Sequence, residues 1–105
     1  MAWLVLVCAG LLEIVWATAL KQSDGFTRFW PSVVGVVGAL VSFLLLAVAL
    51  RHLPAGTGYA VWVGIGAVGV SIAGIVAFDE AVSAARVLFL SIIVVGIVGL
   101  RLVEG

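Results

Sequence analysis

A single carboxylic acid, Glu13, stands in the middle of a long apolar stretch near the start of the chain. An ionisable group at the centre of a membrane helix costs about 3 kcal/mol to insert, and such groups usually mark ion pathways or proton relays. No lysine, arginine or histidine lies at a comparable depth in any apolar stretch to pair with it. The position therefore predicts a functional carboxylate that binds protons and cations.

The chemistry expected of Glu13 is the exchange of a proton for a cation. Burial disfavours the charged form of a carboxylic acid, so Glu13 is suited to carrying a proton. A nearby cation favours the charged form, so protons and cations compete for the same carboxylate. If the protein switches between inward- and outward-facing conformations only when a proton or a cation occupies this site, it exchanges protons for cations across the membrane. The sequence therefore predicts an antiporter and not an enzyme.

Gly10 and Trp16 lie about one helical turn to either side of Glu13, so a gap and an aromatic ring flank the acid. Aromatic faces attract cations, by about 1 to 2 kcal/mol when the contact is desolvated. Gly10 and Trp16 are therefore predicted to line a cation site.

Three residues from later apolar stretches are predicted to complete this lining: Ser42, Tyr59 and Trp62. Tyr59 and Trp62 fall on one face of their helix, where Tyr59 is a candidate either to hydrogen-bond the carboxylate or to gate the cavity. Ser42 has two open interpretations, a hydrogen bond donated to ionised Glu13 or a bond back to a carbonyl of its own helix.

The elements that position these residues are membrane helices. The chain has 105 residues, of which 66% are hydrophobic and 10% charged, which is too apolar for a soluble domain. A helix needs about 20 apolar residues to cross a bilayer, and charges or turn residues separate four such stretches. We expect an all-α membrane protein with a single transmembrane domain, 1–105, and helices at about residues 2–20, 33–50, 57–78 and 85–103. Little chain remains for a catalytic domain or a nucleic-acid interface, and the single cysteine excludes a cysteine metal cluster.

Positive charge is nearly balanced between the two sides of the predicted helices. The first and third loops carry Lys21, Arg28 and Arg86, and the opposite side carries Arg51, Arg101 and the N-terminal amine. Orientation follows the lysine and arginine imbalance of short loops, so this balance predicts insertion in both orientations. Four helices alone do not easily enclose a charge, and a second, inverted copy would supply the missing half of the site. We therefore predict an antiparallel, dual-topology homodimer.

Glycines indicate where helices approach one another. Gly96 and Gly99 share a face of the fourth predicted helix, which has almost no polar side chain, and they are our candidates for the dimer interface. Gly64 and Gly66 in the third helix are candidates for a kink or hinge, with close packing as the equally open alternative.

Three longer motifs are similar to those of a known family, the small multidrug resistance transporters. They are EIVWA at 13–17, KQSDGFTR at 21–28 and LPAGTGYAVW at 53–62. The chain resembles this family from its first helix to its last. Trp16 and the ending GIVGLR at 96–101 resemble the guanidinium exporter subtype, because the multidrug branch usually has glycine at the Trp16 position. Arg101 replaces the more usual lysine, and the loop before Arg86 departs from the common pattern.

This resemblance implies a multi-pass protein of the bacterial inner membrane, an antiparallel homodimer surrounded by lipid that exports guanidinium ion in exchange for protons and needs no cofactor. It assigns Glu13 to shared proton and substrate binding, with Trp16, Ser42, Tyr59 and Trp62 around it. Guanidinium is planar with N–H donors around its edge, which suits bidentate pairing with a carboxylate and stacking on aromatic faces.

Two rival functions remain open. One is a broader exporter of quaternary ammonium or other multidrug cations, against which the bulky Trp16 argues because it narrows the space beside Glu13. The other is a non-transporting subunit or one half of an obligate heterodimer, which would carry a clear charge bias in its loops. The loops of this chain lack such a bias.

Overall fold

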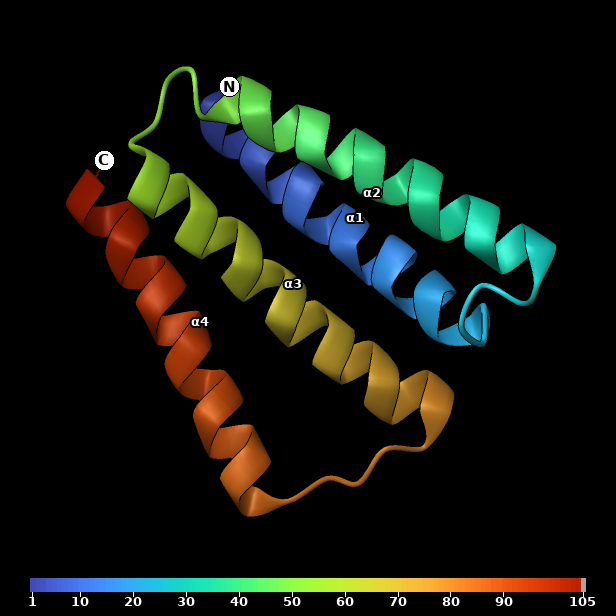
Figure 1. Cartoon of the computed structure of the whole chain (residues 1–105). Coiled ribbons are helices and arrows are strands. Elements are labelled where there is room, and N and C mark those ends of the chain that lie inside the picture. The colour runs from blue at the N-terminus through green and yellow to red at the C-terminus, as the bar shows by residue number, and fades with distance from the viewer. Residues whose placement is uncertain (105) are drawn as a thin grey trace.

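The computed structural model describes residues 1–104, which form four helices joined by short loops (Figure 1). The helices are α1 (Ala2–Gln22), α2 (Phe29–Ala49), α3 (Ala55–Phe78) and α4 (Ala84–Glu104). Each is long and apolar enough to cross a membrane, and the described residues contain no strand. The prediction of an all-α protein with four membrane-spanning helices is thereby confirmed.

Prolines explain where two of the helices begin. α2 begins at Phe29, four residues earlier than predicted, because Pro31 falls in its first turn, where the missing N–H costs no helical hydrogen bond. α3 begins at Ala55 directly after Pro54, whose extended backbone precedes the helix. Our predicted starts at 33 and 57 treated the residues after each proline as loop, so they were late.

α1 lies between α2 and α3, and α4 packs on the outer side of α3 (Figure 1). Glycines permit the close approach of α1 to α2. A Cβ added at Gly38 would lie 3.0 Å from the Cβ of Trp16, and one at Gly35 would lie 2.8 Å from the side chain of Leu20. A buried cluster that includes Leu6, Ala9, Leu46, Val61 and Trp62 fills the space between the first three helices.

α4 is the most loosely attached helix. Its span Ala84–Val103 has no buried residue within the described chain, and it contacts α3 where Ile93 and Ile97 lie over Gly64. A Cβ added at Gly96 or Gly99 would meet no described atom within 4 Å.

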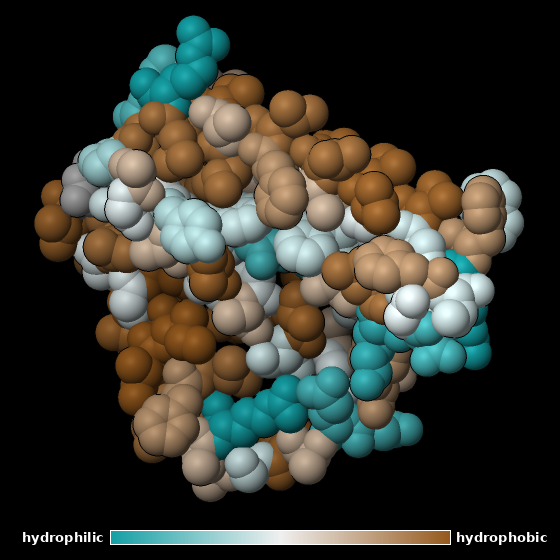
Figure 2. Space-filling view, viewed as in Figure 1, coloured by the Kyte–Doolittle hydropathy of each residue, from teal (hydrophilic) through white to brown (hydrophobic). Residues whose placement is uncertain are grey.

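Both chain ends lie at the end of the molecule that holds the α2–α3 loop (Figure 1). Figure 2 shows apolar residues over the helices and hydrophilic residues gathered toward the ends, the pattern expected of a membrane-embedded protein.

Candidate functional site

The carboxylate of Glu13 is seated directly on the backbone of α3 at Gly66. A Cβ added at Gly66 would overlap with the carboxyl carbon and with both carboxylate oxygens of Glu13. Gly66 is buried, and α3 is continuous through it. The missing side chain at position 66 therefore makes the space that the carboxylate occupies.

Two buried polar atoms of α1 have no hydrogen-bond partner within the described chain: Oε1 of Glu13 and Nε1 of Trp16. Leaving a buried donor or acceptor unpaired costs about 1 to 3 kcal/mol, and more for a charged group. An acceptor and a donor are thus available about one helical turn apart on the same face of α1. This is the polar chemistry that a bound ligand or a second chain can satisfy.

Ser42 is fully buried and joins three helices. Its hydroxyl donates a hydrogen bond to the carbonyl oxygen of Ala9 in α1, at 2.7 Å, and accepts one from Nε1 of Trp62 in α3, at 3.0 Å. The structure thus gives Ser42 a carbonyl partner on a neighbouring helix, where the sequence offered either Glu13 or its own helix. Because the Ser42 hydroxyl donates its proton to the carbonyl oxygen of Ala9 and accepts from Trp62, it fixes the positions of α1 and Trp62 around the site.

Aromatic rings form a continuous row beside Ser42. The ring centroids of Trp16 and Phe43 are 6.1 Å apart, those of Phe43 and Trp62 are 5.7 Å apart, and those of Tyr59 and Trp62 are 5.6 Å apart. Tyr59 is 57% exposed and lies at the outer end of the row. Three of these residues were predicted, but Phe43 was missed. It is the only aromatic residue of the predicted stretch 33–50, and this was the signal that could have identified it.

Two further predicted glycines, Gly10 and Gly64, face apolar side chains. A Cβ at Gly10 would lie 2.8 Å from Ile65, so Gly10 lets α1 pack closely on α3. One at Gly64 would lie 2.9 Å from Ile97 of α4. The hinge role of Gly64 and Gly66 remains a prediction, and in this structure both positions serve close packing within an unbroken helix.

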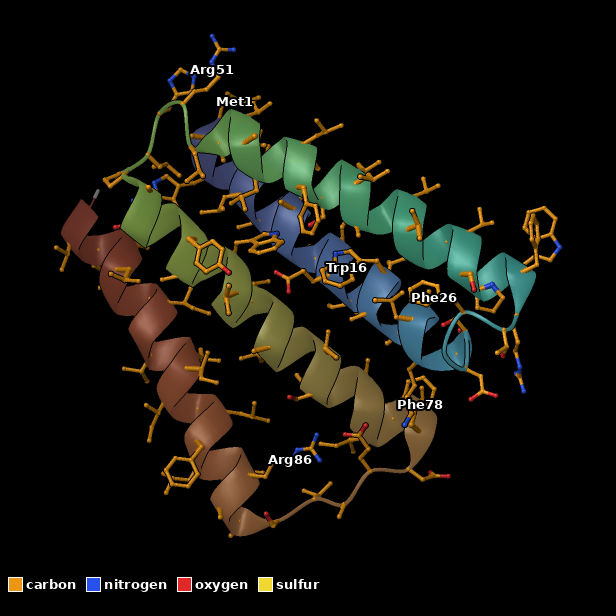
Figure 3. The ribbon with its side chains drawn as sticks, in the orientation of Figure 1. Met1, Trp16, Phe26, Arg51, Phe78 and Arg86 are labelled. Atoms are coloured by element: carbon orange, nitrogen blue, oxygen red, sulfur yellow. The ribbon has the colours of Figure 1, made fainter. Side chains whose placement is uncertain are left out.

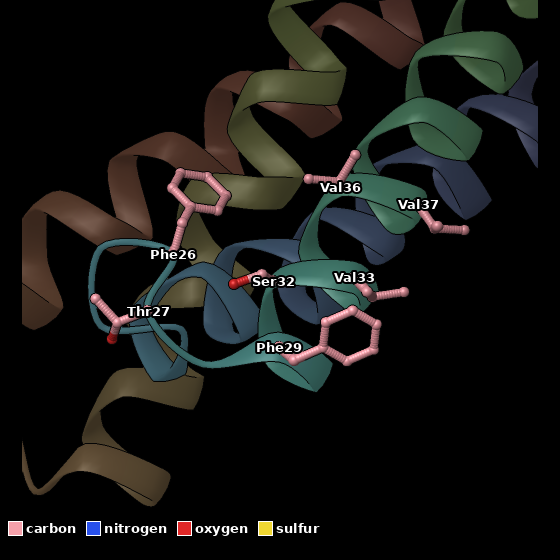
Figure 4. A pocket seen from close by; sticks show the side chains of 7 residues that line it. All are labelled: Phe26, Thr27, Phe29, Ser32, Val33, Val36 and Val37. Carbon is pink, nitrogen blue, oxygen red and sulfur yellow. The ribbon is translucent and has the colours of Figure 1, made fainter.

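The larger cavities lie away from Glu13. One of about 530 Å³ sits at the α1–α2 loop and the start of α2 (Figure 4), and one of about 500 Å³ lies between α1, α3 and the end of α4. The first is lined by Phe26, Thr27, Phe29, Ser32, Val33, Val36 and Val37. Glu13 lines neither of them. Within one described chain, the carboxylate is held in the seam between α1 and α3, at Gly66.

Comparison with known proteins identifies the family of the chain. The family model described as Small Multidrug Resistance protein matches residues 1–93. The chain belongs to the Small Multidrug Resistance family. Together with its four spans, this membership makes it a multi-pass protein of the bacterial inner membrane.

Individual members of the Small Multidrug Resistance family align over nearly the whole chain. A protein of Yersinia pestis named Guanidinium exporter is 56% identical over 102 residues, which cover 97% of this chain and 98% of that protein. Proteins of the same name from Citrobacter freundii and Escherichia coli (strain K12) are each 54% identical over 102 residues, covering 97% of both chains. These matches confirm the resemblance inferred from the motifs. The relatives are named as exporters, which are transporters rather than enzymes.

Proposed function

We propose that this protein is an antiporter that exports guanidinium ion across the bacterial inner membrane in exchange for protons. The observation that carries the proposal is the Glu13 carboxylate, set in the middle of α1, seated on Gly66 and left with an unpaired oxygen. The names of relatives at 54–56% identity support guanidinium as the cation. Small substituted guanidines are further candidate substrates, since one free edge suffices to pair with the carboxylate.

The ligand chemistry of the site suits guanidinium. Guanidinium has only N–H donors, so it complements the unpaired acceptor Oε1 of Glu13. Its planar face can stack on an aromatic ring, and Trp16 lies about one turn along α1 from the acid. Trp62 and Tyr59 continue the aromatic row on α3. A proton on Glu13 removes the charge that holds the cation, and this competition couples the two fluxes.

Alternating access by this small chain requires a partner, and we propose an antiparallel homodimer with paired Glu13 carboxylates. The near-balanced loop charges support insertion in both orientations. The exposed face of α4, with open space at Gly96 and Gly99, supports close contact with a second copy.

The proposed function is tested with purified protein in liposomes. An imposed proton gradient should drive guanidinium against its own gradient, and guanidinium movement should in turn move protons the opposite way. Guanidinium flux that does not respond to the proton gradient would contradict antiport.

Crosslinking tests the antiparallel arrangement. In a chain with Cys8→Ala, a cysteine at Gly96, near the middle of α4, should form a disulfide with its twin in the partner, because Cα atoms within about 7 Å can be bridged. A cysteine at Leu102 should not, since antiparallel helices that cross at Gly96 separate the Leu102 twins, six residues away, by about 18 Å along the axis. Equal crosslinking at both positions would indicate a parallel dimer, and none at Gly96 would exclude α4 as the interface.

Replacing Trp16 by glycine tests the rival function, export of larger quaternary ammonium ions. The indole packs against Phe43 and Gly38, so its removal should widen the site. We expect transport of tetraethylammonium relative to guanidinium to rise by about tenfold, the low end of what a changed pocket shape gives. Trp30→Gly is the matched control, since Trp30 is exposed at the start of α2. An unchanged substrate ratio in Trp16→Gly would remove Trp16 from the basis of selectivity.

A further inference from the structure

Arg86, in the first turn of α4, turns its side chain back toward the end of α3 (Figure 3). Its guanidinium group donates to three oxygen atoms. Nη2 lies 2.8 Å from Oε1 of Glu80 and 3.5 Å from the carbonyl oxygen of Ser71, and Nη1 lies 2.9 Å from the carbonyl oxygen of Ala81. The structure therefore contains one bound guanidinium group, supplied by the chain itself.

The carboxylate of Glu80 is held in place by the turn that ends α3. Asp79 adopts a left-handed conformation, with φ of 53°, and sends the chain back along the helix. The backbone N–H of Glu80 then donates to the carbonyl oxygen of Gly74, at 3.2 Å. A Cβ added at Gly74 would lie 2.6 Å from the Glu80 carboxyl group, so this acid, like Glu13, rests on a glycine of α3.

The two carboxylates lie along the same seam between α1 and α3. Gly66 and Gly74 are eight residues apart, which corresponds to about 12 Å along the helix axis. A small cavity of about 100 Å³ adjoins Glu80 in this seam. It is lined by Ala17, Thr18 and Lys21 of α1 and by Val70, Gly74 and Phe78 of α3. Glu80 thus stands on the loop side of Glu13, at the edge of the membrane-spanning region.

We propose that Glu80, together with the carbonyl oxygens of Ser71 and Ala81, is a second guanidinium-binding site, which Arg86 fills when no guanidinium ion is bound. The ligand class follows from the donor set, because one carboxylate and two carbonyls offer only acceptors, placed around a planar group that has only donors. The role of this site as one that guanidinium occupies before it reaches Glu13 rests on the proposed transport function.

The resident Arg86 is exchangeable. The side chains of Arg86 and Glu80 are 29% and 42% exposed, and partly exposed ion pairs contribute little net stability. A tethered group competes with an effective concentration on the order of millimolar. Guanidinium ion at comparable concentrations should therefore compete with Arg86 for Glu80, and removal of the Arg86 side chain should leave the site free.

The test measures binding of radiolabelled guanidinium to the detergent-solubilised full chain by equilibrium dialysis, with Glu13→Gln in every variant to remove the first site. The Glu13→Gln protein should bind little. Adding Arg86→Ala should create about one site per chain, and adding Glu80→Gln to that pair should reduce binding at least tenfold. Matched controls are Arg51→Ala in place of Arg86→Ala, which should create no site, and Asp79→Asn in place of Glu80→Gln, which should preserve it.

Two further arms define the ligand and guard against misfolding. Tetramethylammonium has the same charge without N–H donors, so an excess of it should not displace the label; displacement would overturn the assignment to guanidinium. Arg86→Lys retains a cation but loses the planar fork, and it should give binding between those of the arginine and alanine chains. Helical content by circular dichroism should be the same in all variants that are compared.

The binding test of the Glu80 site and the flux test of the proposed transport function can fail independently of each other. If neither Glu13→Gln with Arg86→Ala nor Glu13→Gln with Arg86→Lys binds more guanidinium than Glu13→Gln alone, Glu80 and Arg86 form only a structural ion pair. Glu13-dependent flux in liposomes would be untouched by that result. Conversely, binding that depends on Glu80 in a protein without proton-coupled flux would leave this site standing and overturn the proposed function.

Discussion

Replacing Glu13 by glutamine is expected to reduce proton-driven guanidinium flux to the level of protein-free liposomes. The amide keeps the size of the side chain and its seat on Gly66, but it neither releases a proton nor carries the charge that attracts a cation. Both halves of the exchange should therefore be lost together. A second measurement separates binding from movement: guanidinium added to the weakly buffered, detergent-solubilised wild type should release protons, and the glutamine variant should release none.

The controls for this change come from the same chain. Asp79→Asn removes an exposed carboxylate at the end of α3 and should leave flux unchanged, because asparagine also tolerates the left-handed backbone of that position. Glu13→Asp keeps a carboxylate but withdraws it by one methylene, so it should retain proton release with weakened guanidinium binding. Persistent proton-coupled flux in Glu13→Gln would refute the mechanism, whichever residue then proved to carry the proton.

The helices and the central acid could be predicted because each depends only on local sequence. Length and apolarity define a membrane span, and a charge inside a span is conspicuous wherever the helix packs. The error at the start of α2 came from treating Pro31 as a loop residue, whereas proline is compatible with a first helical turn. These inferences require no knowledge of how one helix is rotated against another.

The contacts of the site depend on that rotation and on the register between helices, which a single sequence does not specify. The periodicity of α2 puts Ser42 on a buried face but does not say that the carbonyl of Ala9 lies opposite. Gly66 was equally compatible with a hinge and with a notch until its facing residue was known. Arg86 could be counted among the loop charges from the sequence, but its three oxygen partners depend on how the chain turns after α3.

A methyl group at Gly66 is the second change with a large expected effect, since it would occupy the space of the Glu13 carboxylate. Overpacking of this kind costs about 1 to 3 kcal/mol, so guanidinium affinity should fall by about 5- to 160-fold. The helix itself should not suffer, because alanine is favoured over glycine in a helix interior by about 1 kcal/mol. We therefore expect Gly66→Ala to retain its helical content while losing most of its guanidinium binding and flux.

Shortening the acid should relieve this clash, which makes the contact testable as a pair. In the Gly66→Ala background, Glu13→Asp withdraws the carboxylate by one methylene and should restore part of the affinity, although the same change weakens binding in the wild type. Gly56→Ala is the matched control on α3, since a Cβ there meets no described atom within 4 Å. If the two changes act additively, Glu13 and residue 66 do not share space when guanidinium is bound. If the double variant instead binds guanidinium more tightly than Gly66→Ala alone, the two changes compensate each other. That result would indicate that the space at Gly66 in α3 sets the position at which the Glu13 carboxylate binds its cation.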